Sequence, residues 1–323
     1  MPVIYVSEPI HPEVLRDIAE NAELFVGYGP DAVKYETIAD RVDAVMLRSE
    51  KFPAERIAAS TQLKVIGRHG VGVDTVDVAA ATARGIVVTY CPGGNANAVA
   101  EHVFAMLLSL LRKVCIGHHG LANDPWPKAK QHLVGEELHG RTLGIVGFGG
   151  IGKIVARIAQ GFGMAVSVCD PFVKSLDDFS IRLVNLDTLL KESQAISLHT
   201  PLTPETRHLI NENTLALMRS DAVIINTARS GLIDEKALCA ALEARRIAGA
   251  ALDVLDAEQG LSLNVKFGEK CIAEIPNLLV NPHIAGQTTQ SLRNVGTCAW
   301  NDIQAVLAGE TPKYPFNKPA SQA

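Results

Sequence analysis

The sequence lacks the features that mark a secreted, a membrane-spanning or a nucleic-acid-binding protein. Its six cysteines are dispersed, without a Cys-x-x-Cys pair or a cluster at zinc-ligand spacing. We therefore expect a reducing compartment and no metal ion. No apolar run approaches the ~20 residues that cross a bilayer, and no basic arm accompanies the net charge of -5. Neither a membrane nor a nucleic acid is an expected partner.

The N-terminus also lacks the pattern of a secretory signal peptide. Residues 3–6 read Val-Ile-Tyr-Val, and neither a basic segment nor an apolar run of about 7–15 residues is present there. This stretch predicts a first β-strand instead. A cytoplasmic location is the resulting expectation.

What the sequence does contain is ample material for a core, since hydrophobic residues make up 47% of its 323 residues and charged residues 20%. A chain of this length usually forms two domains, and two lobes imply a cleft. Short β-branched runs alternate with helical stretches, a pattern typical of parallel α/β sheets. The predicted strands are 3–6, 44–47, 64–66, 86–88, 143–146, 165–169, 196–198, 223–225, 250–252 and 278–280.

The domain boundaries are predicted from two helical patterns. Residues 96–113 predict a helix that can bridge two lobes, with Asn95 as its expected N-cap. Residues 118–140 are polar and predict a surface excursion. Residues 288–307 predict another helix, and the first domain is discontinuous if that helix packs back on the first lobe. The predicted domains are 1–97 with 289–323, and 98–288.

A glycine-rich turn between a predicted strand and a predicted helix is the strongest motif. It reads Gly147-Phe148-Gly149-Gly150-Ile151-Gly152. In the dinucleotide-binding pattern the first glycine makes the tight turn and the second lets the backbone approach a pyrophosphate. The third glycine lets helix and strand pack closely, so that the amides at the helix N-terminus face the phosphates.

An acidic residue follows at the expected distance. Asp170 ends the next predicted strand, eighteen residues after Gly152, where a carboxylate accepts hydrogen bonds from the adenosine ribose. Because a carboxylate repels a 2′-phosphate, NAD is expected rather than NADP. The alternative is that the glycines only make a tight turn and that Asp170 is an ordinary strand-ending acid.

Three further polar residues, Arg229, Glu258 and His283, each follow a predicted strand. Ligands bind at the carboxyl ends of strands in open α/β sheets, so the three are expected at one rim. Considered separately, Arg229 could belong to a surface ion pair, Glu258 could be a solvated loop acid, and His283 could be a turn residue. Only their combination is specific for a catalytic set. Five other histidines are expected to be structural or surface residues: His69, His102, His118, His119 and His132.

With these motifs the sequence resembles the D-isomer-specific 2-hydroxyacid dehydrogenase family, of the phosphoglycerate dehydrogenase and hydroxypyruvate reductase type. Besides the glycine turn, the resemblance rests on residues 92–95, 99–102, 199–206, 226–231, 251–254 and 282–286. It implies an α/β fold of two Rossmann-like, doubly wound parallel-sheet domains with a cleft between them. It also implies an oxidoreductase that transfers a hydride between NAD(H) and C2 of a small 2-hydroxy or 2-oxo acid.

The resemblance also implies roles for particular residues. Arg229 would bind the substrate carboxylate, His283 would be the acid/base, and Glu258 would hydrogen-bond the other ring nitrogen of His283. The implied cofactor contacts are Gly147, Phe148, Gly149, Gly150, Ile151, Gly152, Asp170, His199, Thr200, Pro201, Thr206, Thr227, Ala228, Arg229, Asp253, His283 and Gly286. The implied substrate contacts are Arg48, Val71, Gly72 and Asn95.

The sequence departs from the family after Glu258, where Gln259 replaces the usual proline. In a different loop register Asp256 is the competing carboxylate. The position of Arg48 is similar to one at which phosphoglycerate dehydrogenases hold their substrate. There Arg48 would face a second anionic group of the substrate. The alternative is that Arg48 is an exposed arginine at the end of a strand. Substrates of the 3-phosphoglycerate, glycerate or hydroxypyruvate, glyoxylate and sulfolactate types all stay open. The regulatory domain of many phosphoglycerate dehydrogenases is expected to be absent.

Two other functions use the same fold. NAD(H)-sensing corepressors of the C-terminal-binding-protein type recruit partners, although they usually carry an added tail. Formate and phosphite dehydrogenases are the other alternative. Formate enzymes have no alkoxide to protonate and resemble a carboxamide-based set, whereas this chain offers Glu258. By resemblance we also expect a homodimer, joined through the cofactor domain with the segment around Trp126.

Overall fold

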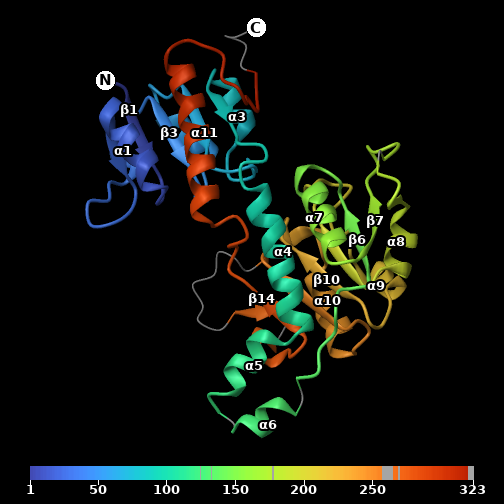
Figure 1. The fold of residues 1–323 in the computed structure, drawn as a ribbon. Coiled ribbons are helices and arrows are strands. Elements are labelled where there is room, and N and C mark those ends of the chain that lie inside the picture. Colours follow the sequence, from blue (N-terminus) through green and yellow to red (C-terminus); the bar gives the residue numbers. More distant parts are fainter. Residues whose placement is uncertain (124, 132, 177, 257–264, 268–269, 319–323) are drawn as a thin grey trace. The chain divides into compact units, whose positions relative to one another are not determined.

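Two compact units make up the chain (Figure 1). The computed structural model describes residues 1–323 except 124, 132, 177, 257–264, 268–269 and 319–323. Unit 1 combines Met1–Asn95 with Gly286–Ala323, and unit 2 is Ala96–Ala285. Each unit is an α/β layer structure around a parallel sheet.

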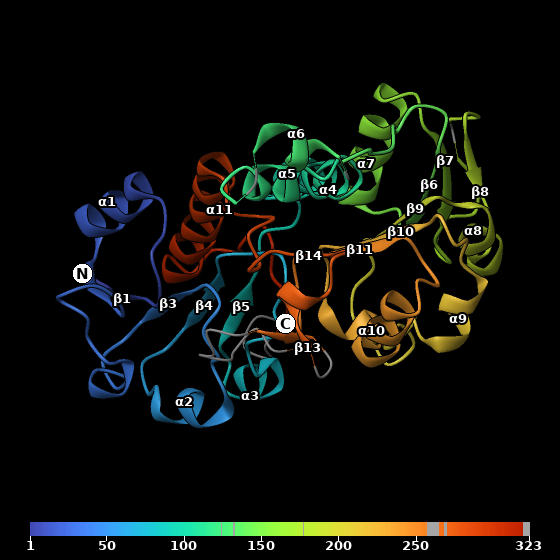
Figure 2. The same ribbon diagram turned by 90° about the horizontal axis from the view of Figure 1, so that it is seen from below.

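Unit 1 contains a five-stranded parallel sheet in the order β2-β1-β3-β4-β5. Its elements are β1 (Val3–Val6), α1 (Pro12–Asn21), β2 (Glu23–Val26), η1 (Tyr35–Thr37), β3 (Ala44–Leu47), α2 (Ala54–Ala59), β4 (Val65–Arg68), α3 (Val78–Ala83), β5 (Val87–Thr89) and α11 (Thr289–Leu307). Helices α1 and α11 cover one face of this sheet, and α2 and α3 cover the other (Figure 2).

The strands of the unit 1 sheet are buried on both sides and carry apolar side chains on both faces. Successive side chains of a strand point to opposite faces, so Ile4 and Val6 pack with α1 and α11 while Val3 and Tyr5 pack on the other side. Helix α11 contributes Trp300, which is 2% exposed, to the first of these cores. The C-terminal helix therefore belongs to the first lobe.

Unit 2 contains a seven-stranded parallel sheet in the order β14-β11-β10-β9-β6-β7-β8, beside a two-stranded hairpin, β12-β13. Its helices are α4 (Ala96–Leu111), α5 (Val114–Gly120), α6 (Trp126–Lys130), α7 (Gly150–Gly161), α8 (Leu186–Glu192), α9 (Glu212–Leu217), η2 (Ser230–Leu232), α10 (Glu235–Glu243) and η3 (Ile272–Glu274). Its strands are β6 (Thr142–Val146), β7 (Ala165–Cys169), β8 (Ile181–Leu183), β9 (Ala195–Leu198), β10 (Val223–Asn226), β11 (Gly249–Leu252), β12 (Lys266–Phe267), β13 (Lys270–Cys271) and β14 (Leu278–Val280). Figure 2 shows α4 and α7 on one face of the large sheet and α8, α9 and α10 on the other.

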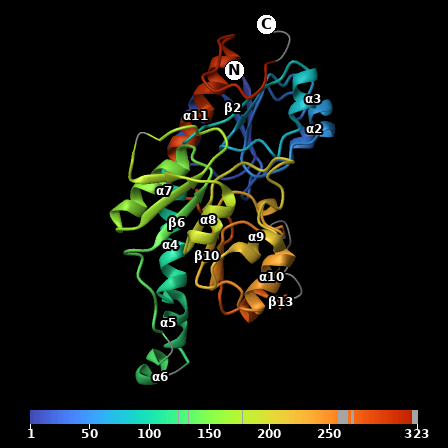
Figure 3. The ribbon, with the colours of Figure 1, turned by 90° about the vertical axis from the view of Figure 1, so that its right-hand side faces the viewer.

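The segment between α4 and β6 differs from its prediction. The helix ends at Leu111, and two short helices, α5 and α6, follow where only a surface excursion was expected. They lie beyond the end of α4 (Figures 1 and 3). Lys113 separates α4 from α5 with a left-handed φ of 55°, which breaks the α-helical geometry.

The N-terminal ends of α4 and α11 differ in how they are capped. Asn95 was expected to cap α4, but its Oδ1 is buried and has no hydrogen-bond partner among the described residues. Thr288 caps α11 as a threonine does at an N-cap, because its side chain accepts a hydrogen bond from the N–H of Ser291 at 3.1 Å. Among the described helices, none is both long and apolar enough to cross a membrane.

Candidate active site

The carboxyl edge of the unit 2 sheet gathers the residues that the sequence singles out. Strands β14, β11, β10, β9, β6 and β7 are adjacent and parallel, so their carboxyl ends share one edge. Within three residues of those ends stand, in the same order, His283, Asp253, Thr227, His199, Gly147 and Asp170. Because open parallel sheets bind ligands at this edge, the row forms one candidate site.

The glycine turn after β6 has the geometry that the motif requires. Gly147 has a left-handed φ of +92°, and a Cβ there would lie 2.7 Å from the carbonyl group of His199. A Cβ on Gly152 would clash with the carbonyl oxygen of Gly147. Gly149 and Gly150, by contrast, have no atom within 4 Å of a built Cβ. The fold itself therefore needs the first and third glycines, whereas the second leaves space in front of the turn.

Asp170 is tied to this turn. Its Oδ2 accepts a hydrogen bond from the N–H of Phe148 at 2.7 Å, and its Oδ1 accepts one from the N–H of Phe172 at 2.9 Å. The side chains of Phe148 and Ile151 pack against the core below. The carboxylate is thus fixed beside the glycine turn, and the ribose contact stays a prediction.

Two polar features of this edge fit a dinucleotide. Helix α7 begins after Gly149 without a side-chain hydrogen bond at its N-cap, so its first amides and its dipole are available to phosphate oxygens. The Oγ1 of Thr227 is buried without a hydrogen-bond partner among the described residues. Leaving a hydroxyl in that state costs about 1–3 kcal/mol, which a polar group of a bound ligand can offset.

The loop after β9 lies beside the glycine turn. Desolvation of the His199 ring lowers its pKa to about 4, so the ring is neutral at neutral pH, and its Nε2 lies 2.8 Å from Ser197 Oγ. Thr206 closes the turn that follows, since its Oγ1 donates to the carbonyl oxygen of Pro201 at 2.7 Å. The backbone of Thr200 stands close to Gly147.

Arg229 stands on a loop that the buried side chain of Asn226 orients. The amide of Asn226 donates to the carbonyl oxygen of Arg229 at 2.8 Å and accepts from the N–H of Ala228 at 3.0 Å. The Arg229 side chain is half-buried, and its Nη1 donates to the carbonyl oxygen of Ala228 at 2.8 Å. A permanent cation is therefore held at the carboxyl end of β10.

Asp253 fixes the loop that carries His283. Its side chain is 0% exposed, and its two oxygens accept hydrogen bonds from the N–H groups of Ile284 at 2.9 Å and Ala285 at 2.8 Å. The N–H of His283 donates to the carbonyl oxygen of Asp253 at 2.9 Å. His283 has a left-handed φ of 53°, a conformation that a non-glycine residue keeps only where its surroundings hold it. The direct cofactor contact of Asp253 stays a prediction.

The sequence did not predict the contact between His102 and Asp253. His102 lies on α4, and its Nε2 is 3.6 Å from Oδ1 of Asp253. This nitrogen is buried and makes no hydrogen bond to any described residue. His102 lies in residues 99–102, one of the stretches on which the resemblance to the family rests. Nothing in the sequence, however, pairs this helix with the end of β11.

The predicted catalytic residue Glu258 lies outside the described residues. The competing carboxylate, Asp256, is exposed, and its backbone N–H donates to Oε1 of Glu235 at 2.7 Å. The assignment of Glu258 therefore stays a prediction.

The predicted substrate residues of unit 1 stand at the carboxyl ends of β3 and β4 and beyond β5. Arg48 donates from Nη1 to the carbonyl oxygen of Pro9 at 2.9 Å, and the carbonyl oxygen of Gly72 accepts a bond from Arg68 at 2.7 Å. Val71 is 38% exposed. Gly286 is predicted to touch the cofactor, and a Cβ there would lie 3.0 Å from the amide nitrogen of Asn95.

A parallel sheet with a glycine turn, a strand-ending acid and a cation at one edge defines a dinucleotide-binding α/β protein. Residues 104–285 match the model of the D-isomer specific 2-hydroxyacid dehydrogenase NAD binding domain. The chain belongs to the D-isomer-specific 2-hydroxyacid dehydrogenase family, and NAD is the cofactor of the matched domain.

Named relatives agree with this family. The chain is 39% identical to D-3-phosphoglycerate dehydrogenase of Synechocystis over 322 residues, 99% of this chain and 56% of that protein. It is 37% identical to hydroxypyruvate reductase of Thermotoga maritima over 295 residues, 91% of this chain and 94% of that protein. The crystal structure of TT0316 protein from Thermus thermophilus is similar with a TM-score of 0.87 at 33% identity, covering 98% of this chain and 100% of that chain. The chain spans little more than half the length of the D-3-phosphoglycerate dehydrogenases that it matches.

Proposed function

We propose that this chain is an NAD-dependent dehydrogenase that interconverts a small D-2-hydroxy acid and its 2-oxo acid. One observation carries the proposal: six adjacent strands of one parallel sheet each place a predicted cofactor-binding or catalytic residue at the same edge. In this proposal unit 2 binds NAD and unit 1 provides the substrate contacts Arg48, Val71, Gly72 and Asn95. Unit 1 is then the substrate domain, and unit 2 is the NAD-binding domain.

The proposed chemistry uses residues of the unit 2 edge. When bound, NADH supplies the hydride for C2. Arg229 binds the substrate carboxylate and polarises the C2 carbonyl group, since a guanidinium matches a carboxylate with two parallel hydrogen bonds. His283, in its protonated form, gives a proton to the C2 oxygen as that oxygen becomes a hydroxyl. Glu258 holds the other ring nitrogen of His283. In the oxidative direction His283 takes the proton back.

The candidate substrates are those of the named relatives and their close analogues. One named relative is a D-3-phosphoglycerate dehydrogenase, and another is a hydroxypyruvate reductase. Glyoxylate and substrates of the sulfolactate type also react at C2. All share a carboxylate beside C2, which is the part that Arg229 would recognise.

A single assay tests this function. NADH absorbance is followed while glyoxylate, hydroxypyruvate, 3-phosphohydroxypyruvate, 3-sulfopyruvate and pyruvate are added separately, and the series is repeated with NADPH. We expect NADH to be consumed with at least one of these acids, and NADPH to be used more slowly because Asp170 stands where a 2′-phosphate would lie. Tight NADH binding without turnover of any acid would count against the dehydrogenase and favour an NAD(H)-sensing protein.

The assembly and location stay predictions. Side chains of Val114, Ile116, Leu121 and Trp126 are large, apolar and between 47% and 72% exposed on and beside α5 and α6. Exposed apolar groups gathered on one segment favour a second protein surface, which supports the predicted homodimer. Light scattering checks it, and the mass of a single chain would remove it. The cytoplasmic location rests on the sequence alone.

A further inference from the structure

Two buried polar atoms lie close together at the carboxyl end of β11. The Nε2 of His102, on α4, is 3.6 Å from Oδ1 of Asp253, which directly follows β11. This nitrogen makes no hydrogen bond to any residue that the structure describes. A buried ring nitrogen left unpaired costs free energy comparable to a lost hydrogen bond. Core packing alone therefore does not explain why a histidine stands here.

The carboxylate of Asp253 has room for a further donor. It is 0% exposed and accepts hydrogen bonds from the N–H groups of Ile284 at 2.9 Å and Ala285 at 2.8 Å. A carboxylate offers about four lone-pair sites to donors, so two amides leave part of its acceptor capacity open. A buried carboxylate is stable only where hydrogen bonds replace its hydration. A third donor beside Oδ1 would therefore stabilise Asp253 in its present orientation.

The imidazole of His102 can be that donor. An imidazole carries a hydrogen on Nε2 both in one of its two neutral tautomers and in its protonated form, so the contact requires no particular charge on the ring. Shortening the 3.6 Å separation by about 0.5 Å brings the two atoms to the length of an N–H···O hydrogen bond. A small rotation of either side chain is enough for this.

Helix α4 is a well-packed support for such a donor. It lies on one face of the unit 2 sheet and packs against β10, β11 and β14 (Figure 2). The neighbouring side chains Val103, Met106 and Leu107 of this helix are at most 2% exposed. Functional side chains are held more precisely on helices and strands than on loops. The helix therefore gives His102 a defined position relative to the end of β11.

The loop after β14 depends on Asp253 at three consecutive residues. The carboxylate accepts from the N–H groups of Ile284 and Ala285, and the N–H of His283 donates to the backbone carbonyl oxygen of Asp253 at 2.9 Å. His283 has a left-handed φ of 53°, which a non-glycine residue keeps only where its surroundings hold it. A rotation of the Asp253 carboxylate would release the two amides that follow His283. The orientation of this carboxylate therefore controls the loop that carries His283.

We propose that His102 is a positioning residue, which donates a hydrogen bond from Nε2 to Asp253 and thereby holds residues 283–285 in the conformation that orients His283. The consequence for catalysis rests on the proposed function, whereas the hydrogen bond does not.

The alternative, which is the structural role expected from the sequence, is that His102 only fills space between α4 and the sheet. The two roles predict opposite effects of substitution. A buried position that needs only volume tolerates an apolar leucine better than a glutamine, whose amide would be left unpaired. A position that needs a donor tolerates glutamine better.

Steady-state kinetics with two His102 variants separates these roles. His102→Gln keeps an N–H donor at about the reach of Nε2, whereas His102→Leu has no donor. With the 2-oxo acid that the protein reduces, we expect His102→Leu to lose about tenfold or more in kcat, the effect of one hydrogen bond to a charged group. Its KM should change by less than about threefold, because Arg229 stands on a separate loop after β10. His102→Gln should keep kcat within about threefold.

His139→Leu is the matched control, since it makes the same change at an exposed turn of unit 2 before β6. We expect it to alter neither kcat nor KM. A lower kcat in His102→Gln than in His102→Leu is the order that space filling predicts, and it would overturn the positioning role.

Hydrogen–deuterium exchange, followed by NMR, tests the contact without any turnover. We expect the amides of Ile284 and Ala285 to exchange about tenfold faster or more in His102→Leu than in the unmodified protein. The rates should be unchanged in His102→Gln and His139→Leu. In the unmodified protein, labelled with 15N-histidine, the ring of His102 should carry a slowly exchanging hydrogen on Nε2. This last measurement decides the hydrogen bond even if His102→Leu does not fold.

The outcomes distinguish His102 from the function as a whole. Turnover of a 2-oxo acid with kcat and exchange unchanged in His102→Leu, or a His102 ring without a hydrogen on Nε2, overturns the positioning role and leaves the proposed function intact. Faster exchange in His102→Leu, with no turnover of any 2-oxo acid by the unmodified protein, supports the hydrogen bond and overturns the dehydrogenase together with the catalytic consequence.

Discussion

The His283→Asn variant is expected to lose about 10²–10⁴-fold in kcat for whichever 2-oxo acid the protein reduces, the range that general acid–base catalysis contributes. An asparagine cannot deliver a proton to the C2 oxygen at neutral pH. It does tolerate the left-handed φ of 53° at this position, because asparagine adopts that conformation more readily than most residues. The loss should therefore come from the chemistry rather than from the loop. Steady-state kinetics with NADH measures it.

His208→Asn is the matched control for this prediction. His208 is another histidine of unit 2 with a left-handed φ, of 50°, and it follows the turn of residues 201–206 rather than the end of β14. We expect His208→Asn to keep its turnover. NADH binding, followed by fluorescence, should persist in His283→Asn and show that the site is still assembled. Full turnover by His283→Asn would remove His283 from the mechanism.

The Gly149→Val variant should lose about 100-fold or more in NADH affinity, equivalent to about 2.7 kcal/mol. Gly149 has extended backbone angles that valine accepts, and a Cβ there meets no atom within 4 Å. The protein should therefore fold. A branched side chain would stand where the backbone is proposed to meet the pyrophosphate, and equilibrium titration with NADH measures the effect.

Gly161→Val controls for the change of residue. Gly161 is the last residue of the same helix, α7, and a Cβ there also meets no atom within 4 Å. Thermal unfolding should show both variants folded, while only Gly149→Val loses affinity. Equal NADH affinity in the two variants would mean that the cofactor does not approach the turn at Gly149.

The sequence did not predict the edge strands β2 and β8 or the paired strands β12 and β13, although it did predict the other two edge strands, β5 and β14. β2 and β8 each pair with one neighbour only, at the ends of the two large sheets. A strand with one neighbour buries less of each side chain, so its apolar pattern is weak; β8 reads Ile-Arg-Leu with only its isoleucine partly buried. Central strands are buried on both faces and appear as continuous apolar runs, which is why β3, β10 and β11 were predicted.

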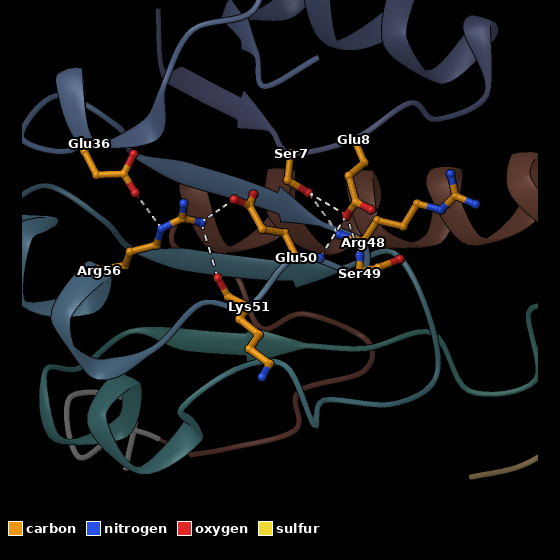
Figure 4. A network of polar contacts seen from close by, with 8 residues as sticks. All are labelled: Ser7, Glu8, Glu36, Arg48, Ser49, Glu50, Lys51 and Arg56. Carbon is orange, nitrogen blue, oxygen red and sulfur yellow. Dashed lines mark hydrogen bonds and ion pairs between the residues drawn. The ribbon is translucent and has the colours of Figure 1, made fainter. Parts of the chain in front are cut away.

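The positions of the candidate site residues in unit 2 could be predicted from the sequence because these residues directly follow strands. A strand's end predicts where a side chain stands, and parallel strands place those ends together. Contacts between distant elements were not readable. The pairing of His102 on α4 with Asp253 after β11 depends on how a helix lies over a sheet. Nothing in the sequence likewise pairs the carboxylate of Glu8 after β1 with the N–H groups of Ser49 and Glu50 after β3 (Figure 4).

The most direct test of the dehydrogenase is the path of the hydride. NADH deuterated at C4 of its dihydronicotinamide ring, on each face in turn, is incubated with the protein and hydroxypyruvate or another acid that it consumes. The product is analysed by mass spectrometry and chiral chromatography. The account predicts deuterium at C2 of a D-2-hydroxy acid from one of the two labelled faces. A product without deuterium at C2 from either face, or NADH bound and never consumed, would contradict it.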